Sequence, residues 1–181
     1  TETFRRLAER NIETLRESGA KTVLATCPEC FLSLSRLYPS VGKLPFEVRH
    51  FYDFLLEHRG RLAFGPGGAA VTFHDPCRLA KHLGIHDTPR DLLAMAGADL
   101  REMPRSRERS VCCGTSGWSN CGLAAKTLQR GRLEEAVASG ARTLVTACPK
   151  CRIHLSCANH DEKRDLRIVD LVEFLANGRK T

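Results

Sequence analysis

Gly19-Ala-Lys-Thr-Val-Leu-Ala-Thr-Cys-Pro-Glu-Cys30 occurs a second time in this 181-residue chain, as Gly140-Ala-Arg-Thr-Leu-Val-Thr-Ala-Cys-Pro-Lys-Cys151. The two stretches are 121 residues apart and share six of their twelve residues. A match of this length at a fixed offset indicates an internal repeat. The similarity continues downstream, where residues 48–55 match residues 168–175 after a slip of one residue. The sequence therefore contains two copies of one structural unit.

Each copy is predicted to alternate helices and strands. Apolar residues at helical spacing from Phe4 to Leu15 predict a helix that stops at Gly19. Apolar runs at 22–25 and 143–146 predict buried strands, and a Cys-Pro-x-Cys follows each of them. A further helix and then a short strand and helix complete each copy. Between the copies we predict a strand over 71–74, a helix over 89–96 and a short strand over 100–103.

This order predicts an α/β fold with mostly parallel strands, built from two related cysteine-rich units. Residues 1–58 are interpreted as the C-terminal half of a first unit, residues 59–70 as a linker that contains Gly-Pro-Gly-Gly, and residues 71–181 as a complete second unit. The first unit lacks a counterpart of residues 71–121. We expect that counterpart to lie upstream of Thr1, or never to have existed.

The composition narrows the class of protein. Nine of the residues are cysteines, and an odd number cannot all form disulfides within one chain. No apolar run approaches the roughly 18 residues of a membrane helix, and no secretion signal is visible. We therefore expect a cytoplasmic protein without a direct membrane span, either free or peripheral to the membrane through a partner subunit. Its reduced thiolates are expected to hold a metal. The net charge of +7 suggests nucleic acid, but metal-bound thiolates would offset most of it locally, so no nucleic-acid partner is expected.

Five cysteines of the second unit are expected to meet at one edge of its sheet. Cys77 is followed after 34 residues by Cys112 and Cys113, and after another 34 residues by Cys148 and then Cys151. Loops after parallel strands converge at one sheet edge, where sites are usually built. A Cys-x-x-Cys pair alone suits zinc or an iron–sulfur cluster equally.

The number and spacing of these thiols favour a polynuclear cluster. A tetrahedral zinc ion has room for four ligands, so a fifth thiolate would be idle. Adjacent cysteines also reach one small ion only with backbone strain. Gly114 and Gly117 would let the backbone approach a cluster and present N–H groups to its sulfides. Zinc, and thiols without any metal, remain as alternatives.

The motifs in the second unit are similar to those of a known family. His74-Asp-Pro-Cys-Arg-Leu79, Cys112-Cys-Gly114 and Ala147-Cys-Pro-Lys-Cys-Arg-Ile-His154 resemble the cysteine-rich CCG domain of heterodisulfide reductase B and D subunits. Similar domains occur in iron–sulfur subunits of glycolate oxidase, anaerobic glycerol-3-phosphate dehydrogenase and lactate-utilisation systems. The full motif lies within residues 71–157, and residues 1–58 resemble the end of a preceding copy.

The resemblance implies which residues hold the cofactor. Five cysteines bind an unusual iron–sulfur centre in that family, and in heterodisulfide reductases it is a noncubane [4Fe-4S] cluster that reduces a disulfide in one-electron steps. The matching ligands here are Cys77, Cys112, Cys113, Cys148 and Cys151. The family's first copy normally has cysteines of its own further upstream. Cys27 and Cys30 are thus interpreted as half of a second site that is empty, holds zinc, or belongs to a second cluster.

Two histidines are candidates for a role beside the cluster. His74 and His154 each lie within three residues of a predicted ligand, and either can donate to cluster sulfur or pass a proton to a substrate thiolate. The alternative is a histidine that is bonded to backbone at the end of an element. Cys121 and Cys157 are interpreted as ordinary thiols.

Three features near the motif have plainer interpretations. Asp75-Pro76 is expected to shape the turn before Cys77. Trp118 either covers the cluster or belongs to the core. The run from Arg101 to Arg109 is a solvated loop or a surface that docks an acidic electron-transfer partner.

The sequence thus predicts an iron–sulfur oxidoreductase subunit of heterodisulfide reductase type, which reduces a disulfide or transfers electrons. Its partners would be other redox subunits: a flavoprotein, a ferredoxin-like protein or a membrane quinone-reactive subunit. One alternative is an electron-relay subunit of a flavin-dependent hydroxy-acid or glycerol-3-phosphate dehydrogenase. Two others are a non-enzymatic zinc-binding interaction domain and a thiol–disulfide enzyme that works through Cys148 and Cys151.

Overall fold

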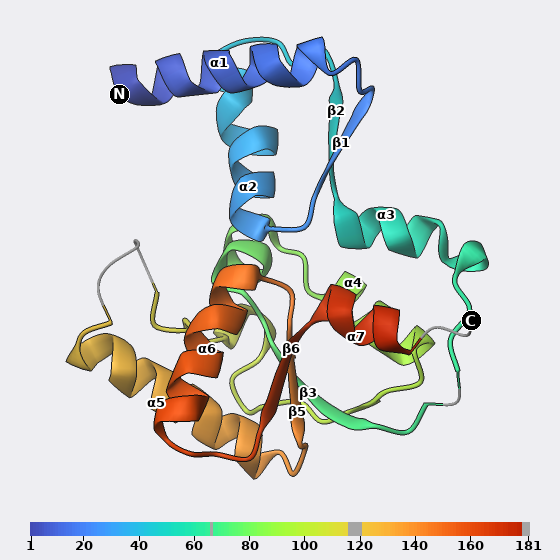
Figure 1. The fold of residues 1–181 in the computed structure, drawn as a ribbon, viewed down its shortest axis with the longest axis vertical. Coiled ribbons are helices and arrows are strands. Elements are labelled where there is room, and N and C mark those ends of the chain that lie inside the picture. Colours follow the sequence, from blue (N-terminus) through green and yellow to red (C-terminus); the bar gives the residue numbers. More distant parts are fainter. Residues whose placement is uncertain (66, 116–120, 179–181) are drawn as a thin grey trace.

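The computed structural model describes residues 1–65, 67–115 and 121–178, and it contains two parallel sheets with helices around them (Figure 1). The first sheet has the strand order β1-β2, and the second has the order β4-β3-β5-β6. Every pairing between these strands is parallel. The predicted α/β fold with mostly parallel strands is therefore confirmed. The elements up to the second sheet are α1 (Glu2–Glu17), β1 (Thr22–Ala25), α2 (Pro28–Leu32), β2 (Glu47–His50) and α3 (Phe51–Glu57).

The second sheet and its helices follow a glycine-rich stretch. Two of its strands end shortly before Cys77 and Cys148, and the helices between the strands make each connection long enough for parallel pairing. The elements are β3 (Ala70–His74), α4 (Asp87–Met95), β4 (Asp99–Leu100), α5 (Leu123–Ala138), β5 (Thr143–Thr146), α6 (Pro149–Asp161), β6 (Arg167–Asp170) and α7 (Leu171–Asn177).

The predicted repeat appears as two runs of equivalent elements. The order α1-β1-α2-β2-α3 returns as α5-β5-α6-β6-α7, and in both runs a Cys-Pro-x-Cys opens the helix after the first strand. The runs differ in what lies beside that strand. β5 pairs with β3 as well as β6, whereas β1 pairs with β2 alone in the described part of the chain. Leu24 of β1 is consequently 38% exposed, while its counterpart Val145 is fully buried.

The second sheet is covered on both faces. Successive residues of β5 point to opposite faces, and Leu144 and Val145 accordingly belong to two different core clusters. The cluster around Val145 includes residues of α4 and α7, and the cluster around Leu144 includes residues of α5 and α6. The sheet is thus enclosed by two layers of helices, which fixes the positions of the strand ends.

Helix α3 joins the first run of elements to the core of the second. Tyr52 is fully buried among residues of β3, β5 and α7, and its hydroxyl donates to Asp170 Oδ1 at 3.0 Å. Phe51, Leu55 and Leu56 pack against the same cluster. The first part of the chain is therefore held to the second by an apolar contact and a hydrogen bond.

Two element predictions differ from the structure in their limits. The helix expected at 89–96 spans Asp87–Met95, and the strand expected at 100–103 is only Asp99–Leu100. The pairing stops early because the Glu102 side chain turns to bind Arg90 and Met103 packs into the core. Pro104 follows and has no N–H with which to continue the ladder.

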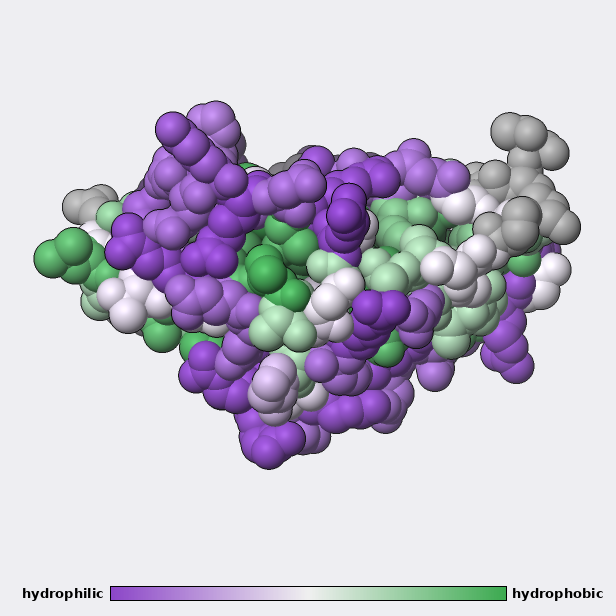
Figure 2. All heavy atoms as spheres, turned by 90° about the horizontal axis from the view of Figure 1, so that it is seen from below, coloured by the Kyte–Doolittle hydropathy of each residue, from purple (hydrophilic) through white to green (hydrophobic). Residues whose placement is uncertain are grey.

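The surface opposite α1 is mainly hydrophilic. Figure 2 shows this face covered by hydrophilic side chains around a narrower central band of hydrophobic ones. Within the described ranges, no helix has both the length and the apolar character that crossing a membrane requires.

Candidate metal centre

The candidate site lies at the carboxyl ends of two neighbouring parallel strands. β3 ends at His74 and β5 ends at Thr146, and these two residues are partners in the register of the sheet. Cys77 follows β3 after a short turn, and Cys148 is the N-cap residue of α6, with Pro149 at the start of the helix. The strand ends therefore bring together cysteines that are 71 positions apart in the sequence.

All five predicted cysteines line one cavity of about 270 Å³. Cys113, Cys148 and Cys151 are buried, and Cys77 and Cys112 are partly exposed. The rest of its wall comes from Glu29, Pro76, Arg78, Lys81, His82, Thr115 and Lys150. The structure thus brings the five cysteines together, as the motif spacing predicts, and adds a mostly basic rim.

The sulfur atoms form a continuous chain of contacts. Cys77 contacts Cys112, Cys112 contacts Cys113, Cys113 contacts Cys151, and Cys151 contacts Cys148. Hydrogen bonding to neighbouring sulfurs, together with burial, raises the pKa of the Cys77 and Cys151 thiols. The bond to Cys112, together with burial, also raises the pKa of Cys113, although the bond to Cys151 opposes this. So many thiols in one place cannot all ionise unless a cation compensates their charge. This arrangement suits a metal centre.

Cys148 is the cysteine of this group whose surroundings favour the thiolate. Hydrogen bonds from the Cys151 and Cys27 thiols lower the pKa of Cys148 to about 3, although burial opposes this. The backbone N–H groups of Lys150 and Cys151 at the start of α6 add to the effect. The charge is therefore concentrated at the first cysteine of the Cys-Pro-x-Cys.

Cys27 is a sixth sulfur at the site, although the motif pattern predicts a different site for it. Its thiol contacts Cys148, the residue at the equivalent position of the second copy. Cys30, by contrast, is exposed and lines a groove beside α1 with Leu15 and Tyr38. Figure 1 shows the reason for the contact between Cys27 and Cys148: the N-terminal ends of α2 and α6, which these two cysteines cap, face each other. The only signal for this contact in the sequence was that Cys27 and Cys148 occupy equivalent positions in the two copies of the repeat.

The Cys-Cys-Gly turn requires its glycine. Gly114 has a φ of +85°, and a Cβ at this position would lie 2.6 Å from the carbonyl oxygen of Ala125 in α5. Only a residue without a side chain lets the turn approach the helix so closely. The hydroxyl of Thr115 next to it lies 2.8 Å from Cys113 Sγ. Gly117 and Trp118 lie outside the described residues.

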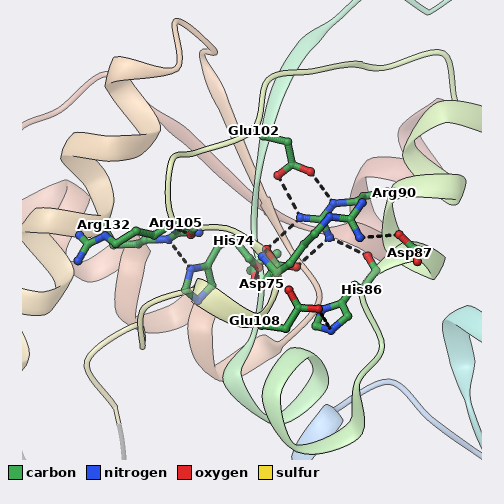
Figure 3. Close-up of polar contacts among 11 residues, drawn as sticks. His74, Asp75, His86, Asp87, Arg90, Glu102, Arg105, Glu108 and Arg132 are labelled. Carbon is green, nitrogen blue, oxygen red and sulfur yellow. Dashed lines mark hydrogen bonds and ion pairs between the residues drawn. The ribbon is translucent and has the colours of Figure 1, made fainter.

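A buried ion-pair network fixes the loop that leads to Cys112 (Figure 3). Arg90 donates to both carboxylate oxygens of Asp75, at 2.8 and 3.0 Å, and also to Glu102. The backbone N–H of Arg107 donates to Asp75 Oδ2 at 2.8 Å. Burial opposes ionisation of Asp75, but these hydrogen bonds outweigh it and lower its pKa. Asp75 thus ties the turn before Cys77 to the loop before Cys112.

The two candidate histidines have different surroundings. His74 is fully buried, and one of its ring nitrogens lies within 4.8 Å of the sulfurs of Cys113 and Cys151. Burial, and then the charge of Arg132, lower its pKa to about 3. His154 is partly exposed on α6, and its Nδ1 lies 3.3 Å from Nε2 of the buried Gln129. Sequence reasoning missed both Arg132 and Gln129, because neither lies near a cysteine motif.

The other residues singled out in the sequence lie around this site. Cys121 and Cys157 are exposed thiols, and Cys121 contacts the amide of Gln129. Within the arginine-rich loop, ion pairs join Arg101 to Asp99, Arg105 to Glu135 and Arg107 to Asp87. Much of the positive charge of this loop is therefore balanced within the chain.

Comparison with known proteins agrees with these motifs. The profile of the cysteine-rich CCG domain family matches residues 1–35 and 71–156. The chain is 36% identical over 180 residues to the D subunit of a dihydromethanophenazine:CoB–CoM heterodisulfide reductase from Methanosarcina barkeri. It is 31% identical over 182 residues to a probable iron-sulfur-binding oxidoreductase of Bacillus subtilis. It is 30% identical over 160 residues to an EtfAB:quinone oxidoreductase of Syntrophomonas wolfei.

The chain spans less than half of each of these relatives. The alignments cover 95%, 96% and 82% of this chain, but only 44%, 26% and 22% of the relatives from M. barkeri, B. subtilis and S. wolfei, respectively. The two segments that match the family profile contain both Cys-Pro-x-Cys motifs and the Cys-Cys-Gly turn. This protein therefore belongs to the family of cysteine-rich CCG domains.

Proposed function

We propose that the chain is part of an iron–sulfur oxidoreductase subunit, in which five cysteines hold one [4Fe-4S] cluster that serves disulfide reduction or electron transfer. The observation that carries this proposal is the chain of touching sulfurs around one cavity of about 270 Å³. The proposed ligands are Cys77, Cys112, Cys113, Cys148 and Cys151. When bound, such a cluster takes up and releases single electrons.

The donor set supports a cluster better than a zinc ion. A structural zinc site is closed by four ligands, and here five thiols line the cavity while Cys27 touches one of them. Several irons give each of the five thiols that line the cavity a partner, and a noncubane arrangement is the form that the family resemblance favours. Cys27 and Cys30 are proposed to serve a second cluster or a zinc ion, together with residues outside this chain.

The rim of the cavity supports a disulfide or thiol substrate with an anionic group. Arg78, Lys81, His82 and Lys150 line the cavity, and Glu29 is the one acidic residue of its described wall. Glu29 forms ion pairs with Lys150 at 3.2 Å and with Arg78 at 3.8 Å, so an anionic ligand would have to compete with it. His154 is the proposed proton donor to a departing thiolate, because it is partly exposed near Cys112.

A relay of electrons without substrate chemistry is the second candidate. The match to an EtfAB:quinone oxidoreductase favours it, because that relative's name describes electron transfer between EtfAB and quinone. In this role the partners would be a flavoprotein, a ferredoxin-like protein or a quinone-reactive subunit. We place both candidates in the cytoplasm, where thiols stay reduced. The proposed units remain residues 1–58, a linker over 59–70, and residues 71–181.

Metal analysis of the anaerobically purified full-length protein tests the proposal. We expect iron and acid-labile sulfide in equal amounts, with a broad visible absorption that disappears on reduction by dithionite. Alanine in place of Cys77 or Cys148 should abolish the cluster, and alanine in place of the exposed Cys157 should leave it intact. A colourless protein with one zinc ion and no iron would refute the proposal.

Stopped-flow reoxidation separates the two candidate roles. The dithionite-reduced protein is mixed with a small anionic disulfide, and the visible absorption is followed. Reoxidation that releases two thiols for every two electrons indicates disulfide reduction, with two protons taken up. If only a quinone or an oxidised flavoprotein restores the absorption, the relay role is correct.

A further inference from the structure

His74 lies beside the proposed cluster, and the role inferred for it rests on the proposed function. His74 is fully buried at the end of β3, and so is Arg132 in α5. Arg132 Nε donates to His74 Nδ1 at 3.0 Å. Other bonds keep the guanidinium in place, because Nη1 donates to Glu135 and to the backbone oxygen of Arg105 at 2.6 and 2.7 Å. The donor that faces His74 is therefore held in place by its own helix and by the loop at Arg105.

This contact determines which nitrogen of the imidazole carries the proton. A guanidinium has donors only, and it stays charged at any pH at which the protein folds. Nδ1 of His74 must therefore present its lone pair to Arg132. A neutral imidazole with an unprotonated Nδ1 carries its hydrogen on Nε2. His74 is thus held as a donor through Nε2.

The Nε2 donor points to no partner within the described ranges of the chain. It is buried, and no described oxygen, nitrogen or sulfur accepts its hydrogen bond. An unpaired buried N–H group is costly, and native structures rarely contain one without a reason. The sulfurs of Cys113 and Cys151 are the nearby groups at the metal centre, within 4.8 Å of a His74 ring nitrogen. The unpaired Nε2 donor thus lies next to the proposed centre.

We propose that His74 donates a hydrogen bond from Nε2 to a sulfur of the proposed centre beside Cys113 and Cys151, and that Arg132 is the positioning residue that makes it a donor. His74 is accordingly not an iron ligand, since ligation through Nε2 would require the loss of that hydrogen while Nδ1 still accepts from Arg132. The hydroxyl of Thr115 adds a second hydrogen bond at Cys113. Both donors would withdraw negative charge from sulfur near Cys113 and so would favour the reduced form of a bound cluster.

The midpoint potential of the cluster in the full-length protein tests this inference. His74→Leu removes the donor, and His74→Gln keeps an amide N–H near the position of Nε2. We expect His74→Leu to disfavour reduction about tenfold, which lowers a one-electron potential by about 59 mV. His74→Gln should recover at least half of this shift. Arg132→Leu should lower the potential, whereas Arg132→Gln, which can still donate, should lower it less.

A matched control shows whether the shift comes from the hydrogen bond. Thr72 lies on the same strand, is fully buried, and has no described partner for its hydroxyl. Thr72→Val is isosteric, so it perturbs β3 without removing a hydrogen bond, and the potential should stay at the wild-type value. Equal potentials in wild type, His74→Leu and His74→Gln, with full iron content in all three, would overturn the inference.

Pulsed EPR of protein labelled with 15N-histidine separates donation from ligation. A hydrogen bond from Nε2 gives a weak 15N coupling in the paramagnetic state of the cluster, and His74→Leu should remove it. A strong coupling typical of an iron-bound nitrogen would show that His74 is a ligand and would overturn the inference. If the wild-type protein holds no iron, the proposed function fails instead, so the two failures are distinguishable.

Discussion

Glu29 and Lys150 occupy the same position in the two copies of the repeat, and their side chains form an ion pair with each other at 3.2 Å. Cys27 and Cys148, which are also equivalent, touch in the same region. Contacts between equivalent residues are the mark of a two-fold arrangement, here within one chain. The two Cys-Pro-x-Cys helices therefore meet around a local pseudo-two-fold axis.

Exchange of the two charges tests this relationship. Glu29→Lys places a third cation beside Lys150 and Arg78, and we expect it to lower the free energy of unfolding by about 1 kcal/mol. The double variant Glu29→Lys, Lys150→Glu restores an opposite pair and should regain most of that loss. Urea denaturation of the four proteins in the double-mutant cycle measures the coupling. Additive effects would show that the pair contributes nothing.

Replacement of the glycine in the Cys-Cys-Gly turn should release the metal. Gly114→Ala introduces a methyl group 2.6 Å from the Ala125 carbonyl oxygen, at a φ that costs an alanine about 1–2 kcal/mol. The turn must then move away from α5 and take Cys112 and Cys113 with it. We expect at least half of the bound iron to be lost. Gly122→Ala is the control, because a Cβ there meets no atom of the described residues within 4 Å. Equal iron content in both variants would contradict this account of the turn.

The ion-pair network around Asp75 should contribute strongly to stability. Asp75→Ala leaves the buried Arg90 with Glu102 as its one charged partner among the described residues and removes the acceptor of the Arg107 N–H. Loss of one partner of a buried pair typically costs about 3–5 kcal/mol. We expect a loss of about 3 kcal/mol in the free energy of unfolding, with weaker metal binding. Asp99→Ala removes a carboxylate from an exposed pair with Arg101 and should cost less than about 1 kcal/mol.

Cys27 should be dispensable for the metal content of the five-cysteine centre. Its thiol donates to Cys148 but it is not among the proposed ligands. Cys27→Ala in the 181-residue chain should therefore keep the iron content of the wild type, whereas Cys148→Ala should lose it. Parallel iron and sulfide assays make this comparison. If the two variants lose iron to the same extent, Cys27 is a ligand of the same centre.

His154 should affect turnover more than it affects the cluster. If it protonates a departing thiolate, His154→Gln lowers kcat for disulfide reduction by about 100-fold and leaves the visible spectrum unchanged. Gln129→Leu, which removes the contact with Nδ1, should have a smaller effect in the same direction. His160→Gln is the control, because His160 lies exposed near the far end of α6. An unchanged kcat in His154→Gln would assign the proton to another source.

The fold was largely predictable because its signals are local. The apolar run at 143–146 and the helix that begins at Pro149 follow from composition and from the Cys-Pro step. The spacing of Cys77, Cys112 and Cys148 similarly indicated that they meet at strand ends. The length of β4 was not predictable, because the contact of Glu102 with Arg90 ends the strand.

The partners of the site residues were harder to predict, because these contacts join residues that are far apart in the sequence. Arg132 lies 58 positions from His74, and only the packing of α5 against the sheet brings the two side chains together. Gln129 reaches His154 across two helices. The motif pattern assigns Cys27 to a second site with Cys30. Its contact with Cys148, made where α2 faces α6, cannot be seen in the sequence because the two cysteines are far apart in it.

The burial of Tyr52 among residues of β3, β5 and α7 also determines how the molecule comes apart. Cleavage of the chain within residues 59–65 would leave α3 held in the second core by its apolar face and by the bond to Asp170. The nicked protein should therefore migrate as a single species under native conditions. We therefore expect the two repeats to unfold in one cooperative transition, so that opening of the five-cysteine site costs the stability of both.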